Sequence, residues 1–297
     1  MVGWLRGLRG TLRELWTHPL TRDRRGRTLA RWLAWQAGSR LVGAPVAVPF
    51  VGPARLLVSP GMTGATGNVY CGLHELEPMA FVGHLLRPGD LFVDAGANVG
   101  SYTVLASKAC GARVLAFEPV PATARRLDDN VRLNDVDHLV EVRPVGLADR
   151  AGDLAFVADL DTMNRVVAAG EVHPGAVALP VARLDDELAG RPGPYVLKVD
   201  VEGFEEAVLA GAPALLADPA LVALVIEVWD GEASPVLARL REAGLTAVRY
   251  DALTRALRPA APGEAARGGN HLLVRSLEAA RQRIASAPPL TVLGRAL

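Results

Sequence analysis

The stretch Leu91-Phe-Val-Asp94-Ala-Gly96-Ala-Asn98-Val-Gly100-Ser-Tyr-Thr103 decides how the chain folds. It reads as an apolar strand that ends in an acid, then a turn with two glycines, then the start of a helix. Glycine adopts positive φ angles and lets the backbone approach a ligand closely. Because ligands bind at the carboxyl ends of the strands in an open α/β sheet, we expect this turn to hold one.

The glycine spacing argues against two common nucleotide-binding loops. The turn reads Gly96-Ala-Asn-Val-Gly100, which lacks the G-x-G-x-x-G spacing of dinucleotide-binding enzymes. No Gly-Lys-Ser or Gly-Lys-Thr follows, so the turn is not the phosphate-binding loop of nucleotide hydrolases either. A nicotinamide-dependent oxidoreductase is therefore a less favoured alternative.

Strands and helical segments alternate around this turn, which predicts an α/β fold with a parallel sheet and helices on both faces. The predicted strands cover residues 91–94, 113–117, 139–145, 195–201 and 221–228, with an antiparallel pair at 246–250 and 271–275. The predicted helices cover residues 73–86, 102–109, 121–134 and 204–216. Residues 150–190 interrupt the alternation, and we expect extra short strands there.

Two of the predicted strands end in further acids. Glu118-Pro119 follows the second strand, where a carboxylate can accept hydrogen bonds from both hydroxyls of a ribose. The fourth strand carries Lys198, Asp200 and Glu202 on one face until it bends. A lysine buried in an apolar strand needs a partner, so we expect it to form an ion pair with one of these two acids.

Composition limits the class of protein. The chain has 297 residues, is half hydrophobic and carries no net charge, which excludes an intrinsically disordered chain. Cys71 and Cys110 cannot make a disulfide framework or supply the four ligands of a structural zinc site. The apolar runs are far shorter than the roughly 18 residues that span a bilayer. We therefore expect a cytoplasmic protein.

The zero net charge hides an uneven distribution. Residues 1–40 contain nine arginines against Glu14 and Asp23, a net charge of +7, which leaves −7 for the rest of the chain. A negative sheet domain argues against nucleic acid as a partner. Apolar residues recur at helical spacing at Trp4, Leu5, Leu8, Leu12, Leu15 and Trp16. We expect this stripe to dock on the sheet domain, with peripheral contact to an anionic membrane as the alternative.

Four segments, in order along the chain, resemble those of a known family. They are Asp94-x-Gly-x-Asn-x-Gly100, Ala116-Phe-Glu-Pro119, Leu127-x-x-Asn130-x-x-x-Asn134 and Lys198-Val-Asp-Val-Glu-Gly-x-Glu205. With Tyr70-Cys-Gly-Leu-His-Glu75 and a weaker match at Gly269-Asn270, they resemble the FkbM-type S-adenosylmethionine-dependent methyltransferases. The resemblance covers about residues 65–230.

The resemblance implies the class I methyltransferase fold, a Rossmann-like sheet of seven strands with helices on both faces and the last strand antiparallel. Four segments follow for this chain: a basic amphipathic helical segment at 1–45, strands and a helix that pack on the core at 46–88, the methyltransferase domain at 89–278, and a C-terminal tail at 279–297. The first two form a helical and β extension at the N-terminus.

The resemblance also implies a cofactor site for S-adenosylmethionine. Its residues are Asp94, Gly96, Asn98, Gly100, Glu118, Pro119, Gly146, Leu147 and Asp200. Asp94 and the glycine turn would hold the methionyl part, Glu118 the ribose, and Gly146-Leu147 the adenine. Asp149 is a candidate partner of the adenine amine.

As the activity, the resemblance implies O-methylation of a hydroxyl group on a small molecule, a sugar or a natural product. An alcohol has a high pKa, so a general base helps as its proton leaves. Asp200 and Glu202 are the first candidates, before Glu227 and His173, and no metal ion is expected. The 150–190 region is rich in Ala and Val, and its main polar candidates for the substrate side are Asn164, Arg165 and His173, which leaves the acceptor open. A catalytically inactive cofactor-binding or scaffold module is the alternative, and the oligomeric state stays open.

Overall fold

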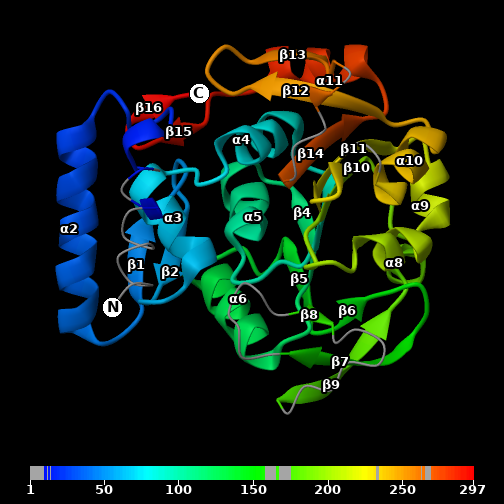
Figure 1. Cartoon of the computed structure of the whole chain (residues 1–297), viewed down its shortest axis with the longest axis horizontal. Helices are drawn as coiled ribbons and strands as arrows, with labels where there is room; N and C mark the ends of the chain where they lie inside the picture. Colours follow the sequence, from blue (N-terminus) through cyan, green and yellow to red (C-terminus); the bar gives the residue numbers. More distant parts are fainter. Residues whose placement is uncertain are drawn as a thin grey trace.

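The computed structural model describes residues 10–11, 13, 15–157, 165–166, 175–231, 234–261, 263–264 and 269–297. Its centre is an eight-stranded sheet in the order β13-β12-β14-β11-β10-β3-β4-β5 (Figure 1). In chain order the strands are β3 (Leu91–Ala95), β4 (Arg113–Phe117), β5 (Val140–Arg143), β10 (Tyr195–Val199), β11 (Leu221–Val228), β12 (Thr246–Asp251), β13 (Ala256–Pro259) and β14 (Gly269–Val274).

The sheet is parallel from β5 to β11, and β14 lies antiparallel between β11 and β12. The predicted fold class is therefore confirmed: a largely parallel sheet whose last strand in the chain is inserted antiparallel. Because the parallel strands all end at one edge, the acids that follow β3, β4 and β10 meet there.

An eighth strand corrects the predicted seven. The sequence predicts only the strands at 246–250 and 271–275 in this part of the chain, but Ala256–Pro259 also pairs with β12 as an antiparallel hairpin. The Asp251 carboxylate closes the turn, because it accepts hydrogen bonds from the N–H groups of Leu253 and Thr254 at 2.8 and 3.0 Å. An aspartate that caps a turn in this way gives a hairpin without the usual Asn-Gly or Gly-Gly signal.

Helices cover both faces of the sheet, and each face has its own apolar cluster. One cluster holds side chains from α3 (Thr63–Cys71), α4 (Leu76–Leu85), α5 (Ser101–Val104), α6 (Pro121–Leu133) and α11 (Leu277–Ala285). The other holds side chains from α7 (Leu184–Leu188), α8 (Glu205–Ala210), α9 (Pro213–Ala217) and α10 (Pro235–Glu242). Strand β3 contributes side chains to both clusters, because Phe92 points to the first and Val93 to the second.

Three predicted helices have different bounds. The helix predicted over 73–86 is α4, which begins later, at Leu76, whereas α3 before it has no counterpart among the predicted helices. Gly72, directly after α3, has a φ of 84° and leaves no room for a Cβ beside Val292. The helix predicted over 204–216 is interrupted, and α9 begins anew at Pro213. The helix that follows the glycine turn starts as α5 and continues as a π-helix over Leu105–Ala109.

The extra strands expected in the 150–190 region form a second sheet. Its four strands, in the order β6-β9-β7-β8, are β6 (Gly146–Leu147), β7 (Gly152–Val157), β8 (Arg165–Val166) and β9 (Ala176–Ala182). This sheet lies at the lower side of the molecule in Figure 1, next to the carboxyl end of the central sheet. Asn164 and His173 lie outside the described residues.

The N-terminal hairpin is joined to the C-terminal segment of the chain. In the turn between β1 (Val46–Pro49) and β2 (Arg55–Val58), Val51 pairs with Val292 of the short hairpin β15 (Thr291–Val292) and β16 (Arg295–Ala296). The boundary predicted at residue 278 falls inside α11. No helix among the described residues has the length and apolar character needed to cross a membrane.

Part of the predicted N-terminal stripe is docked. Leu15 is buried in the larger apolar cluster, together with Leu20 and with Trp35 of α2 (Arg25–Val42). Trp16 is exposed over 40% of its surface. The remaining members of the stripe lie outside the described residues; they are Trp4, Leu5, Leu8 and Leu12.

Two buried asparagines of α6 tie the N-terminal hairpin to the glycine turn. The Asn130 side chain accepts a hydrogen bond from the N–H of Leu57 at 2.7 Å and donates one to the carbonyl of Val99 at 2.8 Å. Asn134 bonds both backbone groups of Arg55 in the same way. The Asn130-x-x-x-Asn134 motif is therefore structural, because it fixes β2 and the turn against one helix.

We expect Asn130→Ala to lower the free energy of unfolding by about 2–4 kcal/mol, because it leaves the N–H of Leu57 and the carbonyl of Val99 without their partner. Urea unfolding measures the change. Arg126→Ala, on the exposed side of the same helix, is the control and should change stability by less than about 0.5 kcal/mol. Equal stabilities of the two variants would show that the asparagine bonds do not matter.

Candidate functional site

A cavity of about 310 Å³ lies at the carboxyl edge of the central sheet. This volume is within the range of small-molecule sites. Of the nine predicted cofactor residues, seven line it: Gly96, Asn98, Glu118, Pro119, Gly146, Leu147 and Asp200. The two predicted catalytic residues, Asp200 and Glu202, both line it as well. The structure thus brings together residues that lie up to about a hundred positions apart in the chain.

Gly96 and Gly100 have different reasons to be glycine. Gly96 has a φ of 80°, and a Cβ there would lie 1.8 Å from the carbonyl oxygen of Asp200, so no side chain fits between the turn and the end of β10. Gly100 has a φ of 92° and faces Leu127 of α6 instead of the cavity. Gly96 therefore shapes the site directly, whereas Gly100 allows α6 to pack against the turn.

Glu118 is held in place by the backbone of two segments. Its carboxylate accepts hydrogen bonds from the N–H of Asn98 at 3.1 Å and from the N–H of Val120 at 2.9 Å. Burial raises the pKa of Glu118 to about 7, although these two hydrogen bonds oppose the rise. Each carboxylate oxygen keeps a lone pair for a further donor. Glu118 is thus a fixed acceptor in the cavity wall.

Asp94 lies behind the cavity wall and is fully buried. Thr103 donates a hydrogen bond of 2.7 Å to its Oδ2, whereas its Oδ1 accepts no hydrogen bond among the described residues. Burial raises the pKa of Asp94, against the opposing effects of Lys198 and Thr103. That oxygen faces the ammonium of Lys198 at 3.9 Å, so the charge of Asp94 is directed to a buried cation of the chain itself.

Lys198 forms the predicted ion pair with Asp200. Its Nζ lies 3.0 Å from Asp200 Oδ2 and 3.9 Å from Asp94 Oδ1, and it sits 5.0 Å from the centroid of the Tyr102 ring. Burial disfavours the charge, but the carboxylates of Asp200 and Asp94 outweigh it and hold the pKa of Lys198 above its ordinary value. One buried cation therefore orders two carboxylates and one ring.

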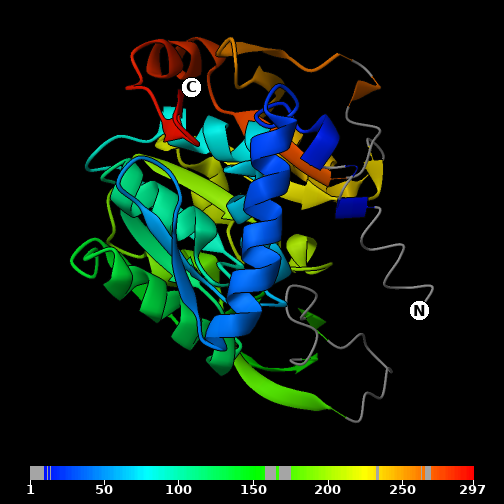
Figure 2. The same ribbon diagram turned by 90° about the vertical axis from the view of Figure 1, so that its left-hand side faces the viewer.

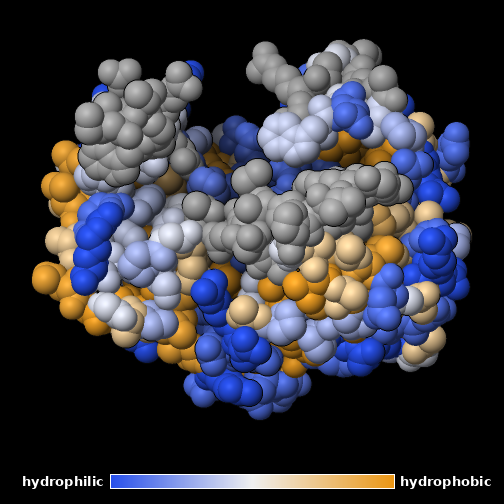
Figure 3. All heavy atoms as spheres, turned by 60° about the horizontal axis from the view of Figure 1, so that its bottom comes forward, coloured by the Kyte–Doolittle hydropathy of each residue, from blue (hydrophilic) through white to orange (hydrophobic). Residues whose placement is uncertain are grey.

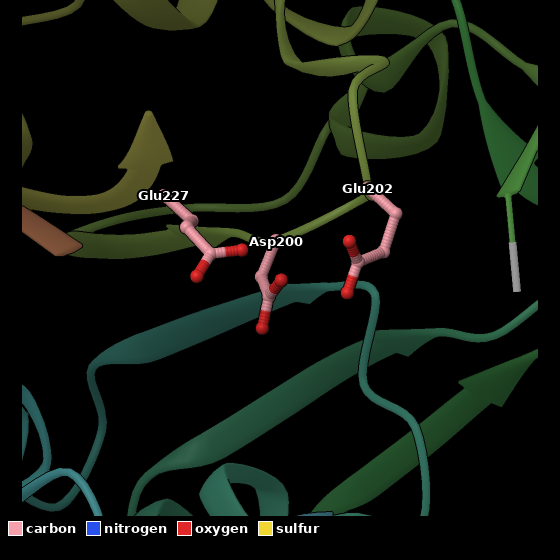
Figure 4. Close-up of side chains that lie close together, drawn as sticks. All are labelled: Asp200, Glu202 and Glu227. Carbon is pink, nitrogen blue, oxygen red and sulfur yellow. The ribbon is translucent and has the colours of Figure 1, made fainter. Parts of the chain in front are cut away.

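Three carboxylates meet at one end of the cavity: Asp200, Glu202 and Glu227, with oxygens all within 4.8 Å of one another (Figure 4). Glu202 has a φ of 47°, so the bend after β10 turns it toward the other two. Burial and the two neighbouring carboxylates raise the pKa of Glu227 to about 7, and burial together with Asp200 raises that of Glu202. The absence of a metal ion here stays a prediction.

Glu75 is a polar residue that lines the cavity, and the sequence analysis assigns it no role of its own. Its carboxylate accepts a hydrogen bond of 2.8 Å from the Tyr102 hydroxyl and another from the Asn270 amide. These three residues come from the start of α4, from α5 and from β14. The Tyr70–Glu75 segment and Gly269-Asn270 were both visible as motifs, but only the fold shows that they meet.

The other end of the cavity is apolar. Leu147, Phe156 and Phe204 line it beside Pro119. Asp149 does not line the cavity, and its carboxylate lies 3.5 Å from the guanidinium of Arg150 at the surface. This end of the cavity therefore has an apolar wall against which a flat group can pack. Asp149 is not part of that wall.

Comparison with known proteins identifies the family. The family model of the methyltransferase FkbM domain matches residues 94–244, just over half of the chain. The chain belongs to the FkbM methyltransferase family. The match begins at Asp94 and includes the glycine turn, Glu118 and the acids that follow β10.

Two curated relatives agree with this family. The 31-O-demethyl-FK506 methyltransferase FkbM of Streptomyces tacrolimicus is 33% identical over 201 residues, which cover 55% of this chain and 75% of that protein. Methyltransferase 1 of Beauveria bassiana is 34% identical over 148 residues, 42% of this chain and 59% of that one. A solved FkbM methyltransferase of Methylobacillus flagellatus is 17% identical, with a TM-score of 0.44 over 70% of this chain and 52% of its own.

The cofactor of this FkbM-family chain is S-adenosylmethionine, as predicted. The residues of the cavity fit it. The acceptor Glu118 suits a ribose, and the group of three carboxylates suits a ligand with a positive charge. The wall of Leu147, Phe156 and Phe204 suits a flat base. The close approach at Gly96 leaves backbone in place of side chain beside them.

We expect Glu118→Ala to weaken binding of S-adenosylmethionine by about tenfold or more, because hydrogen bonds to a charged group contribute roughly 1.5–3 kcal/mol. Isothermal titration calorimetry measures the affinity. Asp149→Ala is the control and should bind as the natural protein does, since Asp149 lies outside the cavity. Unchanged affinity in Glu118→Ala would remove the ribose role from this residue.

The cofactor-free protein should lose stability as the pH rises. Glu118 and Glu227 titrate near 4.5 when unfolded but near 7 when folded, so the folded chain binds more protons between these values. The free energy of unfolding therefore falls from about pH 4.5 to about pH 7 and levels off above. Glu227→Gln should flatten this fall in urea unfolding at a series of pH values, whereas exposed Glu206→Gln should not. Parallel curves for Glu227→Gln and the natural protein would contradict the raised pKa.

Proposed function

We propose that this chain transfers a methyl group from S-adenosylmethionine to a hydroxyl group of a small molecule, a sugar or a natural product. The observation that supports this most is the group of Asp200, Glu202 and Glu227 at the polar end of the cofactor cavity. Such a group can take up a proton at the point where an alcohol gives one up. The name of the Streptomyces relative, 31-O-demethyl-FK506 methyltransferase, is in keeping with an oxygen acceptor.

When bound, S-adenosylmethionine supplies a methyl group activated by its positively charged sulfur. The chain's own residues provide position and charge. Asp94 and Lys198 fix the floor of the site, and the backbone contact between Gly96 and Asp200 sets how far the turn lies from the acid group. Holding two reactants in line is itself a large part of catalysis for a displacement.

The three acids differ in their ability to accept a proton. The carboxylate of Asp200 is already engaged by Lys198 at 3.0 Å. The pKa values of Glu202 and Glu227 are raised, that of Glu227 to about 7, close to the value at which a general base works best. We assign the role of proton acceptor to Glu202 or Glu227. Asp200 orients these two side chains.

We expect both Glu202→Gln and Glu227→Gln to lower kcat. The variant that removes the proton acceptor should lower it by about 10²-fold or more. S-adenosylmethionine affinity should fall much less, because neither residue was assigned to the cofactor. Turnover is measured by mass spectrometry on a screen of hydroxylated acceptors, with Glu206→Gln as a matched control outside the cavity.

Two results would count against this function. Full turnover in both glutamine variants would place the base elsewhere in the chain. Tight binding of S-adenosylmethionine with no mass shift in any hydroxylated acceptor would favour a cofactor-binding or scaffold module without transfer activity.

A further inference from the structure

Helix α2 is apolar on two sides but covered on only one. Thr28, Trp35 and Ser39 are buried against the rest of the molecule, and Trp35 belongs to the larger apolar cluster. The helix stands beside α3 at one edge of the molecule in Figure 1, and Figure 2 shows it in front along its whole length. A surface helix normally turns its apolar stripe to the core and polar residues to water, but the outer side of α2 carries apolar residues as well. The outer side of α2 therefore lacks a cover among the described residues.

The outer side forms one stripe, which we call the α2 stripe. Its members recur three or four residues apart and are all exposed: Ala30, Leu33, Ala34, Ala37 and Leu41. Leu33 is 53% exposed and Leu41 86%. With Trp16 and Val42, they make up four of the seven large hydrophobic side chains exposed among the described residues. Apolar residues gather at the same left-hand edge in Figure 3.

Arginines border the α2 stripe. Arg25, Arg27 and Arg40 are exposed on the same helix, in a segment whose net charge is +7. The guanidinium of Arg25 lies 5.8 Å from the ring centroid of Trp16, which keeps that exposed ring at the N-terminal end of the helix. An apolar stripe bordered by arginines, with a tryptophan at its end, has the composition of helices that lie in the headgroup region of a membrane.

Charge decides between a membrane and a second copy of the chain. A two-fold dimer through the α2 stripe would place the arginines of one copy against the same arginines of the other. Like charges at such an interface are unfavourable. Anionic phospholipids instead attract each arginine near the surface and cover the apolar stripe at the same time.

We propose that the α2 stripe lies on the surface of an anionic membrane, with Leu33 and Leu41 in the apolar part of the interface and the arginines among the phospholipid headgroups. The contact is peripheral, because no helix among the described residues is able to span the bilayer. It is separate from the cofactor site, since the described residues that line the cavity begin at Asn68.

The test is sedimentation of the full chain with vesicles. The natural protein should bind vesicles that contain phosphatidylserine, bind pure phosphatidylcholine much less, and release on addition of salt. Leu33→Glu combined with Leu41→Glu should weaken binding to the phosphatidylserine vesicles by at least about tenfold, through lost apolar contact and added repulsion. Affinity for S-adenosylmethionine and the melting temperature should stay as they are, because both side chains are exposed.

Leu253→Glu provides the matched control, because Leu253 is also an exposed leucine, at 46%, in the turn after β12. It should leave vesicle binding unchanged. Equal binding by the Leu33/Leu41 double variant and the natural protein would overturn the proposal, as would no binding by the natural protein. A natural protein that is dimeric by light scattering and becomes monomeric in the double variant would also overturn it, in favour of a second copy.

Discussion

The site depends on one buried cation. Lys198 is almost fully buried in the middle of the sheet, between the carboxylates of Asp94 and Asp200 and under the ring of Tyr102. A lone ammonium at such depth is strongly unfavourable, and so are two carboxylates without a partner. Each is tolerated because the others are present. The hydroxyl of the same Tyr102 donates a hydrogen bond to Glu75. The side-chain arrangement around Lys198 therefore extends to the segment before the sheet domain.

Asp200 joins the cofactor turn to the acid group. Its carbonyl oxygen occupies the space that a Cβ of Gly96 would need, its N–H bonds the carbonyl of Ala95, and its carboxylate pairs with Lys198. The two halves of the site therefore cannot shift independently. A displacement of β10 would change both the width of the turn and the position of Glu202, which follows Asp200 in a bend of positive φ.

The local sequence pattern predicted most of the acids at the carboxyl edge of the sheet, but not the residues that lie across the cavity from them. The acid after each parallel strand was enough to place Asp94, Glu118 and Asp200 together, because parallel strands end at one edge. Glu75 and Asn270 were missed, since their contact joins segments almost two hundred residues apart and no periodicity records it. Gly100 shows a related limit: the sequence shows that a glycine is needed, but not whether a ligand or a helix approaches it.

The acids of the site and the arginines of α2 lie in different parts of the molecule. Six carboxylates surround the cavity or its floor, those of Glu75, Asp94, Glu118, Asp200, Glu202 and Glu227, and Lys198 is the cation buried among them in the described part of the chain. The arginines of α2 stand elsewhere, on a helix that packs against α3. An arginine that faced the cavity would pair with the acids, lower their pKa values and weaken the attraction for a positively charged cofactor. The zero net charge is the sum of +7 in residues 1–40, which include most of α2, and −7 in the rest of the chain, which carries the acids of the site.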